Sequence, residues 1–89
     1  MNQESFSGDH LIGRNIRHRR WQRGETQLEL AEKLGISLRE VKLYETGVRS
    51  VPVLLLKRIA TAQETSIEYY RDELGPFAVA STSNQFQIR

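Results

Sequence analysis

The apolar positions of this chain recur at helical spacing in several short segments that polar residues separate. Leu11, Ile12 and Ile16 form a narrow apolar stripe, and we expect a helix from about residue 10 to residue 23, capped by Asp9. Four further segments share this periodicity, and we expect helices over residues 27–34, 38–46, 52–63 and 67–74. The pattern therefore predicts an all-α domain with five helices.

The second and third of these segments each begin with a capping box. In the first box, Thr26 stands three residues before Glu29. Ser37 and Glu40 repeat this arrangement at the third segment. In such a box the hydroxyl accepts from a backbone N–H three residues on, and the carboxylate accepts from the N–H of the capping residue. A three-residue turn, residues 35–37, joins the two helices, which predicts a helix-turn-helix whose second helix can fit a DNA major groove.

Composition limits the function classes that remain. The 89 residues suit one domain, and 38% hydrophobic with 27% charged residues is typical of a soluble globular protein. Cysteine is absent, which excludes disulfides and thiolate metal sites. The longest apolar run, residues 53–56, is too short to span a membrane. The first residues lack a basic stretch followed by an apolar one, so we expect no signal peptide. Because nothing marks an activated nucleophile or a phosphate loop, we expect a cytoplasmic protein that is not an enzyme and holds no cofactor or metal.

Charge is distributed unevenly along the chain. The net charge is only +2, but residues 11–50 hold nine Lys and Arg against five Asp and Glu. A basic first half fits a surface that faces phosphates. The alternative at this point is an ordinary solvated helix face.

Residues 11–74 resemble the Cro/C1-type (XRE-like) helix-turn-helix domains of phage repressors and bacterial regulators. Four parts carry the resemblance in one register: Thr26-Gln27, Leu30-Ala31, Leu34-Gly35 and Tyr44-Glu45-x-Gly47. The resemblance implies a five-helix lambda-repressor-like DNA-binding domain over residues 9–75. We expect flexible tails over residues 1–8 and 76–89, and the second tail is alternatively a segment that a partner orders.

The resemblance also implies roles for particular residues. Outward positions of the recognition helix, residues 38–46, are expected to contact bases: Leu38, Arg39, Lys42 and Leu43. Arg39 is the best candidate for direct readout, because its guanidinium can donate to both guanine O6 and N7. Candidates for phosphate contact are Gln27, Arg14, Arg17 and Arg49. Arg20 and Glu45 match a pair that forms a structural salt bridge between the first and third helices.

Some positions depart from the family pattern. Leu38 and Leu43 are apolar where most relatives have polar base-reading residues, and they suit thymine methyl contact, a protein-binding patch or chance exposure. Leu54 and Leu55 fall outside the inward stripe of the fourth helix, which suits a dimer or partner interface or chance exposure. Gln63 stands where the family usually has an apolar core residue.

Together these features predict a sequence-specific transcriptional regulator, a dimeric repressor whose helix over residues 38–46 reads the major groove of double-stranded DNA. The alternative is an anti-activator that uses the same surface to sequester another regulatory protein. We expect no membrane and no small-molecule ligand.

Overall fold

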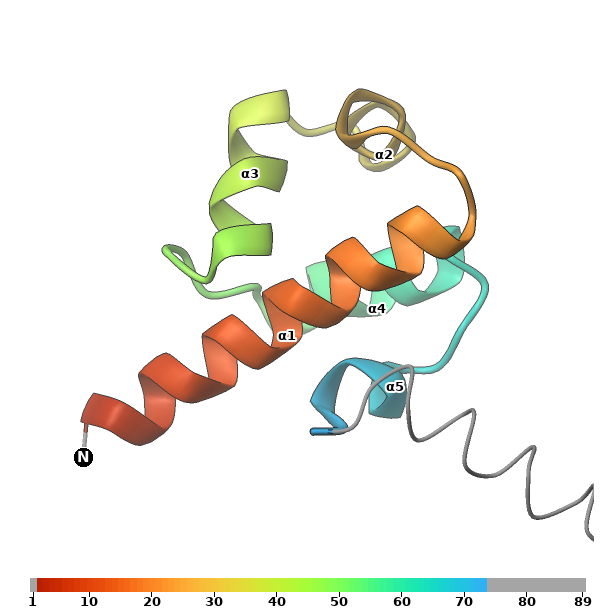
Figure 1. The fold of residues 1–89 in the computed structure, drawn as a ribbon. Helices are drawn as coiled ribbons and strands as arrows, with labels where there is room; N and C mark the ends of the chain where they lie inside the picture. Colours follow the sequence, from red (N-terminus) through yellow and green to blue (C-terminus); the bar gives the residue numbers. More distant parts are fainter. Residues whose placement is uncertain (1, 74–89) are drawn as a thin grey trace, which may run out of the picture.

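Five α-helices make up the part of the chain that the computed structural model describes, which is the backbone of residues 2–73 and the side chains of residues 8–73 (Figure 1). The helices are α1 (Asn2–Gln22), α2 (Gln27–Leu34), α3 (Leu38–Thr46), α4 (Val53–Ala62) and α5 (Ile67–Arg71). No strand occurs within this part, so the all-α prediction is confirmed. The predicted tail over residues 76–89 lies outside the described residues.

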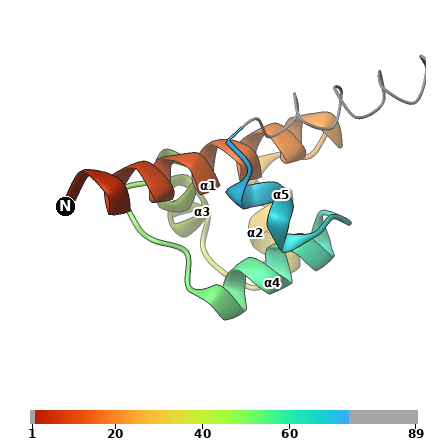
Figure 2. The same cartoon turned by 90° about the horizontal axis from the view of Figure 1, so that it is seen from below.

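The long helix α1 runs diagonally across the molecule, with α2 and α3 on one side of it and α5 on the other (Figure 1). The view from below shows the same relation, with α3 behind α1 and α5 in front of it (Figure 2). A core between the helices contains the fully buried apolar side chains, among them Ile16, Leu30, Leu34, Val41, Leu56, Ile59 and Tyr70. Helix α3 thus lies at the edge of the fold and keeps one face outside the core.

The first helix begins earlier than the sequence pattern predicts. It starts at Asn2 and not near residue 10, so the predicted cap at Asp9 is wrong, and residues 2–8, expected in a separate tail, belong to α1. This segment contains no proline, and Gly8 is its one residue of very low helix propensity, so the helix can extend. The Asp9 carboxylate instead accepts a hydrogen bond from Ser50 Oγ at 2.6 Å, which joins α1 to the loop before α4.

Both predicted capping boxes are present. Thr26 Oγ1 accepts from the Glu29 N–H at 3.0 Å, and Glu29 Oε1 accepts from the Thr26 N–H at 2.8 Å. Ser37 and Glu40 make the same two bonds, both at 3.0 Å. Each helix then ends at a glycine in the left-handed conformation, Gly35 (φ 70°) and Gly47 (φ 79°). Local sequence therefore sets the length and rigidity of α2 and α3 at both ends.

The polar residue at position 63 is fully buried, and both ends of its amide are hydrogen-bonded. Gln63 Oε1 accepts from the Tyr70 hydroxyl at 2.6 Å, and Gln63 Nε2 donates to the Ile16 carbonyl at 3.2 Å. Burial raises the pKa of Tyr70 well above its ordinary value, so the hydroxyl keeps its proton and remains a donor. The buried Gln63 amide and the Tyr70 hydroxyl therefore both have hydrogen-bond partners, which offsets the cost of placing them in an apolar core.

Candidate nucleic-acid interface

Most cations in the first half of the chain are used inside the fold. Five of the nine Lys and Arg between residues 11 and 50 bond to described carboxylates or backbone carbonyls at 3.3 Å or less: Arg14, Arg19, Arg20, Arg23 and Lys33. A sixth, Arg49, forms only an exposed pair with Glu40 at 3.8 Å. The basic half is therefore not a uniform phosphate-facing surface. The cations left for a partner lie on and around α3: Arg17, Arg39, Lys42 and Arg49.

Two of the internal cations bind the C-terminal ends of the last helices. Arg19 donates from Nε to the Gln63 carbonyl at 2.9 Å and from Nη2 to the Glu64 carbonyl at 3.1 Å, just after α4. Arg14 donates from Nη2 to the Glu73 carbonyl at 2.8 Å, beyond α5. These bonds join α1 to backbone carbonyls in the segments that follow α4 and α5. Because α5 and α3 lie on opposite sides of α1 (Figures 1 and 2), the structure does not bring Arg14 together with the other predicted phosphate contacts.

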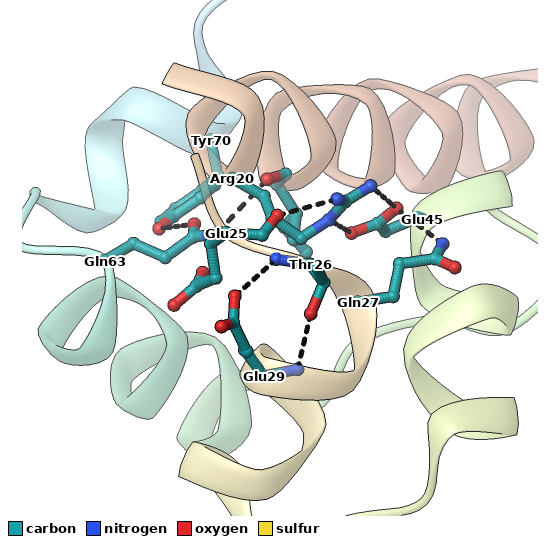
Figure 3. Close-up of polar contacts among 9 residues, drawn as sticks. Arg20, Glu25, Thr26, Gln27, Glu29, Glu45, Gln63 and Tyr70 are labelled. Atoms are coloured by element: carbon teal, nitrogen blue, oxygen red, sulfur yellow. Dashed lines mark hydrogen bonds and ion pairs between the residues drawn. The ribbon is translucent and has the colours of Figure 1, made fainter. Parts of the chain in front are cut away.

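A buried ion pair fixes α3 against α1. Arg20 Nε and Nη2 donate to the two carboxylate oxygens of Glu45 at 2.7 and 3.0 Å, and the side chains are 8% and 1% exposed (Figure 3). Arg20 Nη1 also donates to the Glu25 carbonyl at 2.9 Å, in the turn that precedes α2. The structure thus places the two partners of the predicted pair in bidentate contact. One guanidinium links three elements and determines how α3 is presented.

Gln27, the first residue of α2, belongs to the same network. Its Nε2 donates to Glu45 Oε1 at 3.0 Å, so its amide is held beside α3 (Figure 3). The backbone N–H of Gln27 is in the first turn of α2, where helix N–H groups have no partner within the helix. This backbone donor can meet a phosphate oxygen. The side chain acts first as a link between α2 and α3, which its sequence position alone does not reveal.

The outer face of α3 carries the predicted base-contacting residues. Leu38, Arg39 and Lys42 are exposed, and Leu43 is half-buried. The side chains of Arg39 and Lys42 make no hydrogen bond or ion pair with the described residues, so their donors point to solvent. Arg49 follows α3, and its Nη1 lies 3.8 Å from Glu40 Oε2 in an exposed pair that solvent screens. A rigid helix with two cations available on its outer face suits a negatively charged groove.

The two leucines predicted for a partner interface differ in their surroundings. Leu54 is 75% exposed, whereas Leu55 is half-buried and packs against the core. Val53, next to Leu54 at the beginning of α4, and Val48 in the preceding loop are also exposed apolar residues. The exposed apolar side chains near the predicted interface are therefore Val48, Val53 and Leu54, and Leu55 contributes little.

Sequence reasoning assigned no function to Trp21. Its ring is 57% exposed, and the Arg17 guanidinium lies 5.1 Å from its centroid. The sequence did contain a signal for this contact, because Arg17 and Trp21 are four residues apart on one helix and such residues are neighbours on the helix surface.

The fold and the surface define a small helix-turn-helix domain in which α3, the second helix of the motif, carries Arg39 and Lys42 on its exposed face. A model of the helix-turn-helix family matches residues 16–70, and the chain belongs to this family, so the predicted Cro/C1-type resemblance is confirmed. None of the helices in residues 2–73 has the length and apolar character needed to cross a membrane.

Known proteins with similar sequences are named as regulators. The chain is 32% identical over 66 residues to the uncharacterized HTH-type transcriptional regulator y4aM of Sinorhizobium fredii. This alignment covers 74% of this chain and 46% of the relative. The uncharacterized HTH-type transcriptional regulator y4wC of the same organism is 32% identical over 83 residues, and the alignment covers 90% of this chain and 58% of that relative. The chain thus spans about half the length of these curated relatives.

A solved structure has the same fold. The clp gene regulator ClgR from Corynebacterium glutamicum superposes with a TM-score of 0.72 at 25% sequence identity, covering 90% of this chain and 86% of that one. The five-helix lambda-repressor-like prediction is confirmed at the level of the fold.

Proposed function

We propose that this chain is a cytoplasmic, sequence-specific DNA-binding transcriptional regulator, a repressor that inserts the outer face of α3 into the major groove. The observation that carries the proposal is the contrast among its cations. Arg39 and Lys42 are exposed and without partners among the described residues, whereas five other cations of residues 11–50 are bonded internally. The capping boxes and the Arg20–Glu45 pair support it by holding α3 rigid before binding.

In this proposal the contacts divide into two groups. Arg39, Lys42 and Leu38 read base edges, and Leu43 contributes an apolar contact from the rim of the same face. Arg17, Arg49 and the N-terminus of α2 at Gln27 bind the flanking phosphates, which fix the register of the helix on the duplex. Arg14 has no part in it, because its guanidinium binds the end of α5.

Replacement of Arg39 tests the base-reading role. We expect Arg39→Ala to lower affinity for the preferred duplex by about 5- to 150-fold, the equivalent of roughly 1–3 kcal/mol for a bidentate contact with guanine. Affinity for random duplex should fall much less. The preferred duplex is obtained by unbiased selection with the purified full chain, and fluorescence anisotropy at fixed salt then compares the two DNAs.

The matched control for this experiment is Lys57→Ala, which removes an exposed cation from α4. This variant should bind both duplexes as the parent chain does. An equal loss on both duplexes in Arg39→Ala would contradict base reading. Absence of any duplex binding at low salt, together with a tight complex with another regulator, would favour the anti-activator alternative.

We further propose that the regulator binds as a homodimer through the exposed apolar residues Val48, Val53 and Leu54. Two copies would then meet two half-sites about one helical turn apart. Leu54→Glu is expected to shift the protein from dimer to monomer in analytical ultracentrifugation. It should also weaken binding to a two-half-site duplex while leaving single half-site binding unchanged. A monomeric parent chain bound to the two-half-site duplex would contradict this arrangement.

A further inference from the structure

We infer that Trp21, the single tryptophan of the chain, belongs to the nucleic-acid interface as a positioning residue that holds the Arg17 guanidinium beside a backbone phosphate. This inference rests on the proposed function and extends it to a second helix. It assigns Trp21 a role that packing within the domain does not explain.

Helical spacing puts Arg17 on the side of α1 that faces α3. Gly13, Arg17 and Arg20 recur at i, i+4 and i+7, so they share one face of α1. At one end of this row, a Cβ on Gly13 would lie 2.3 Å from the Tyr44 carbonyl oxygen. At the other end, Arg20 binds Glu45 at 2.7 Å. Arg17 therefore sits between two points of contact with α3, next to the network that holds the start of α2.

The Arg17 guanidinium has an aromatic partner and, among the described residues, no ionic one. It lies 5.1 Å from the centroid of the Trp21 ring, within the range of a cation–π interaction. Its Nε is buried without a hydrogen-bond partner, and no described carboxylate forms an ion pair with it. This stacking restrains the side chain without neutralising its charge. The charge thus remains available to an anion on the α3 side of α1.

The Trp21 ring itself contributes little to the core. It is 57% exposed and is absent from the set of apolar side chains packed in or against the core. The His18 ring meets it edge-on, with centroids 5.5 Å apart and planes at 81°. Between His18 and Arg17 the indole is held in one orientation. Ordering an arginine before binding removes part of the entropic cost of ordering it in the complex.

The test is a double-mutant cycle in the full chain, with duplex affinity as the readout. We expect Trp21→Ala to weaken binding about three- to tenfold on preferred and random duplexes alike, because a phosphate contact carries no sequence information. Trp21→Phe keeps an aromatic face and should restore most of the affinity. Arg17→Ala should reduce the slope of log affinity against log salt by about one. In the Arg17→Ala background, Trp21→Ala should have no further effect.

Control measurements separate this role from a structural one. Gln22→Ala alters the adjacent exposed residue of α1 and should bind as the parent chain does. Urea unfolding should give the same midpoint for Trp21→Ala and Gln22→Ala. Emission of the single tryptophan should change on saturation with DNA.

The possible outcomes distinguish this inference from the proposed function. Losses from Trp21→Ala and Arg17→Ala that simply add would overturn the positioning role, and so would parent-like affinity of Trp21→Ala. In either case an Arg39→Ala variant that still loses base preference would leave the proposed function intact. A parent chain that binds no duplex at low salt would overturn both.

Discussion

Glu45→Ala is expected to lower the free energy of unfolding by about 3–5 kcal/mol, because it leaves the Arg20 guanidinium buried without its carboxylate. Both side chains lie in the interior, 8% and 1% exposed, and the contact is bidentate. Small domains are stable by only about 5–15 kcal/mol, so this loss is a large fraction of the total. Urea unfolding followed by circular dichroism measures it.

Two control variants test whether the loss of stability in Glu45→Ala comes from the unpaired buried charge. Arg49→Ala breaks an exposed pair whose atoms are 3.8 Å apart, and it should cost less than about 1 kcal/mol. Replacement of both partners, Arg20→Met with Glu45→Leu, removes the unpaired charge and should recover much of the stability. If Glu45→Ala unfolds at the same urea concentration as Arg49→Ala, the buried pair is not what fixes α3 to α1.

Local signals made α2 and α3 predictable from the sequence. Each capping box closes within four residues, and each terminal glycine follows directly, so no distant contact is needed to define either helix. The beginning of α1 was predicted wrongly because Asp is a residue type that often caps helices. The Asp9 carboxylate instead accepts a hydrogen bond from Ser50, which lies 41 residues away in the sequence. Hydrogen bonds that close within one turn of a helix can be predicted from the sequence. Contacts with a residue that is distant in the sequence cannot.

The same distinction applies to the candidate interface. The sequence alone does not distinguish Arg14 from Arg39, since both are arginines in a basic segment. In the structure Arg14 binds the Glu73 carbonyl, 59 residues away, and Arg39 faces solvent. Only the fold distinguishes a cation that binds a distant backbone carbonyl from one that is available to a phosphate. Leu55 illustrates the apolar case, because it lies off the inward stripe and still packs against the core. The face of α3 was predictable because periodicity and the family register agree there.

Gly13→Ala is expected to destabilise the fold by about 3 kcal/mol, at the upper end of the usual cost of overpacking. A Cβ at this position would lie 2.3 Å from the Tyr44 carbonyl oxygen and 2.6 Å from that of Glu45. Both atoms belong to the backbone of α3, which cannot move aside as a flexible side chain does. The methyl group would therefore push α3 away from α1 and strain the Arg20–Glu45 pair. Urea unfolding measures the stability, and duplex affinity should fall with it.

Gly8→Ala provides the matched control, since both glycines lie in α1 and only one of them touches α3. A Cβ on Gly8 would meet no atom of the described residues within 4 Å, so the substitution should raise the free energy of unfolding by up to about 1 kcal/mol through helix propensity alone. The opposite signs of the two effects distinguish a steric cause from a general property of α1. Equal stabilisation by both substitutions would mean that α1 and α3 do not approach each other at Gly13, and the orientation proposed for the outer face of α3 would lose its structural basis.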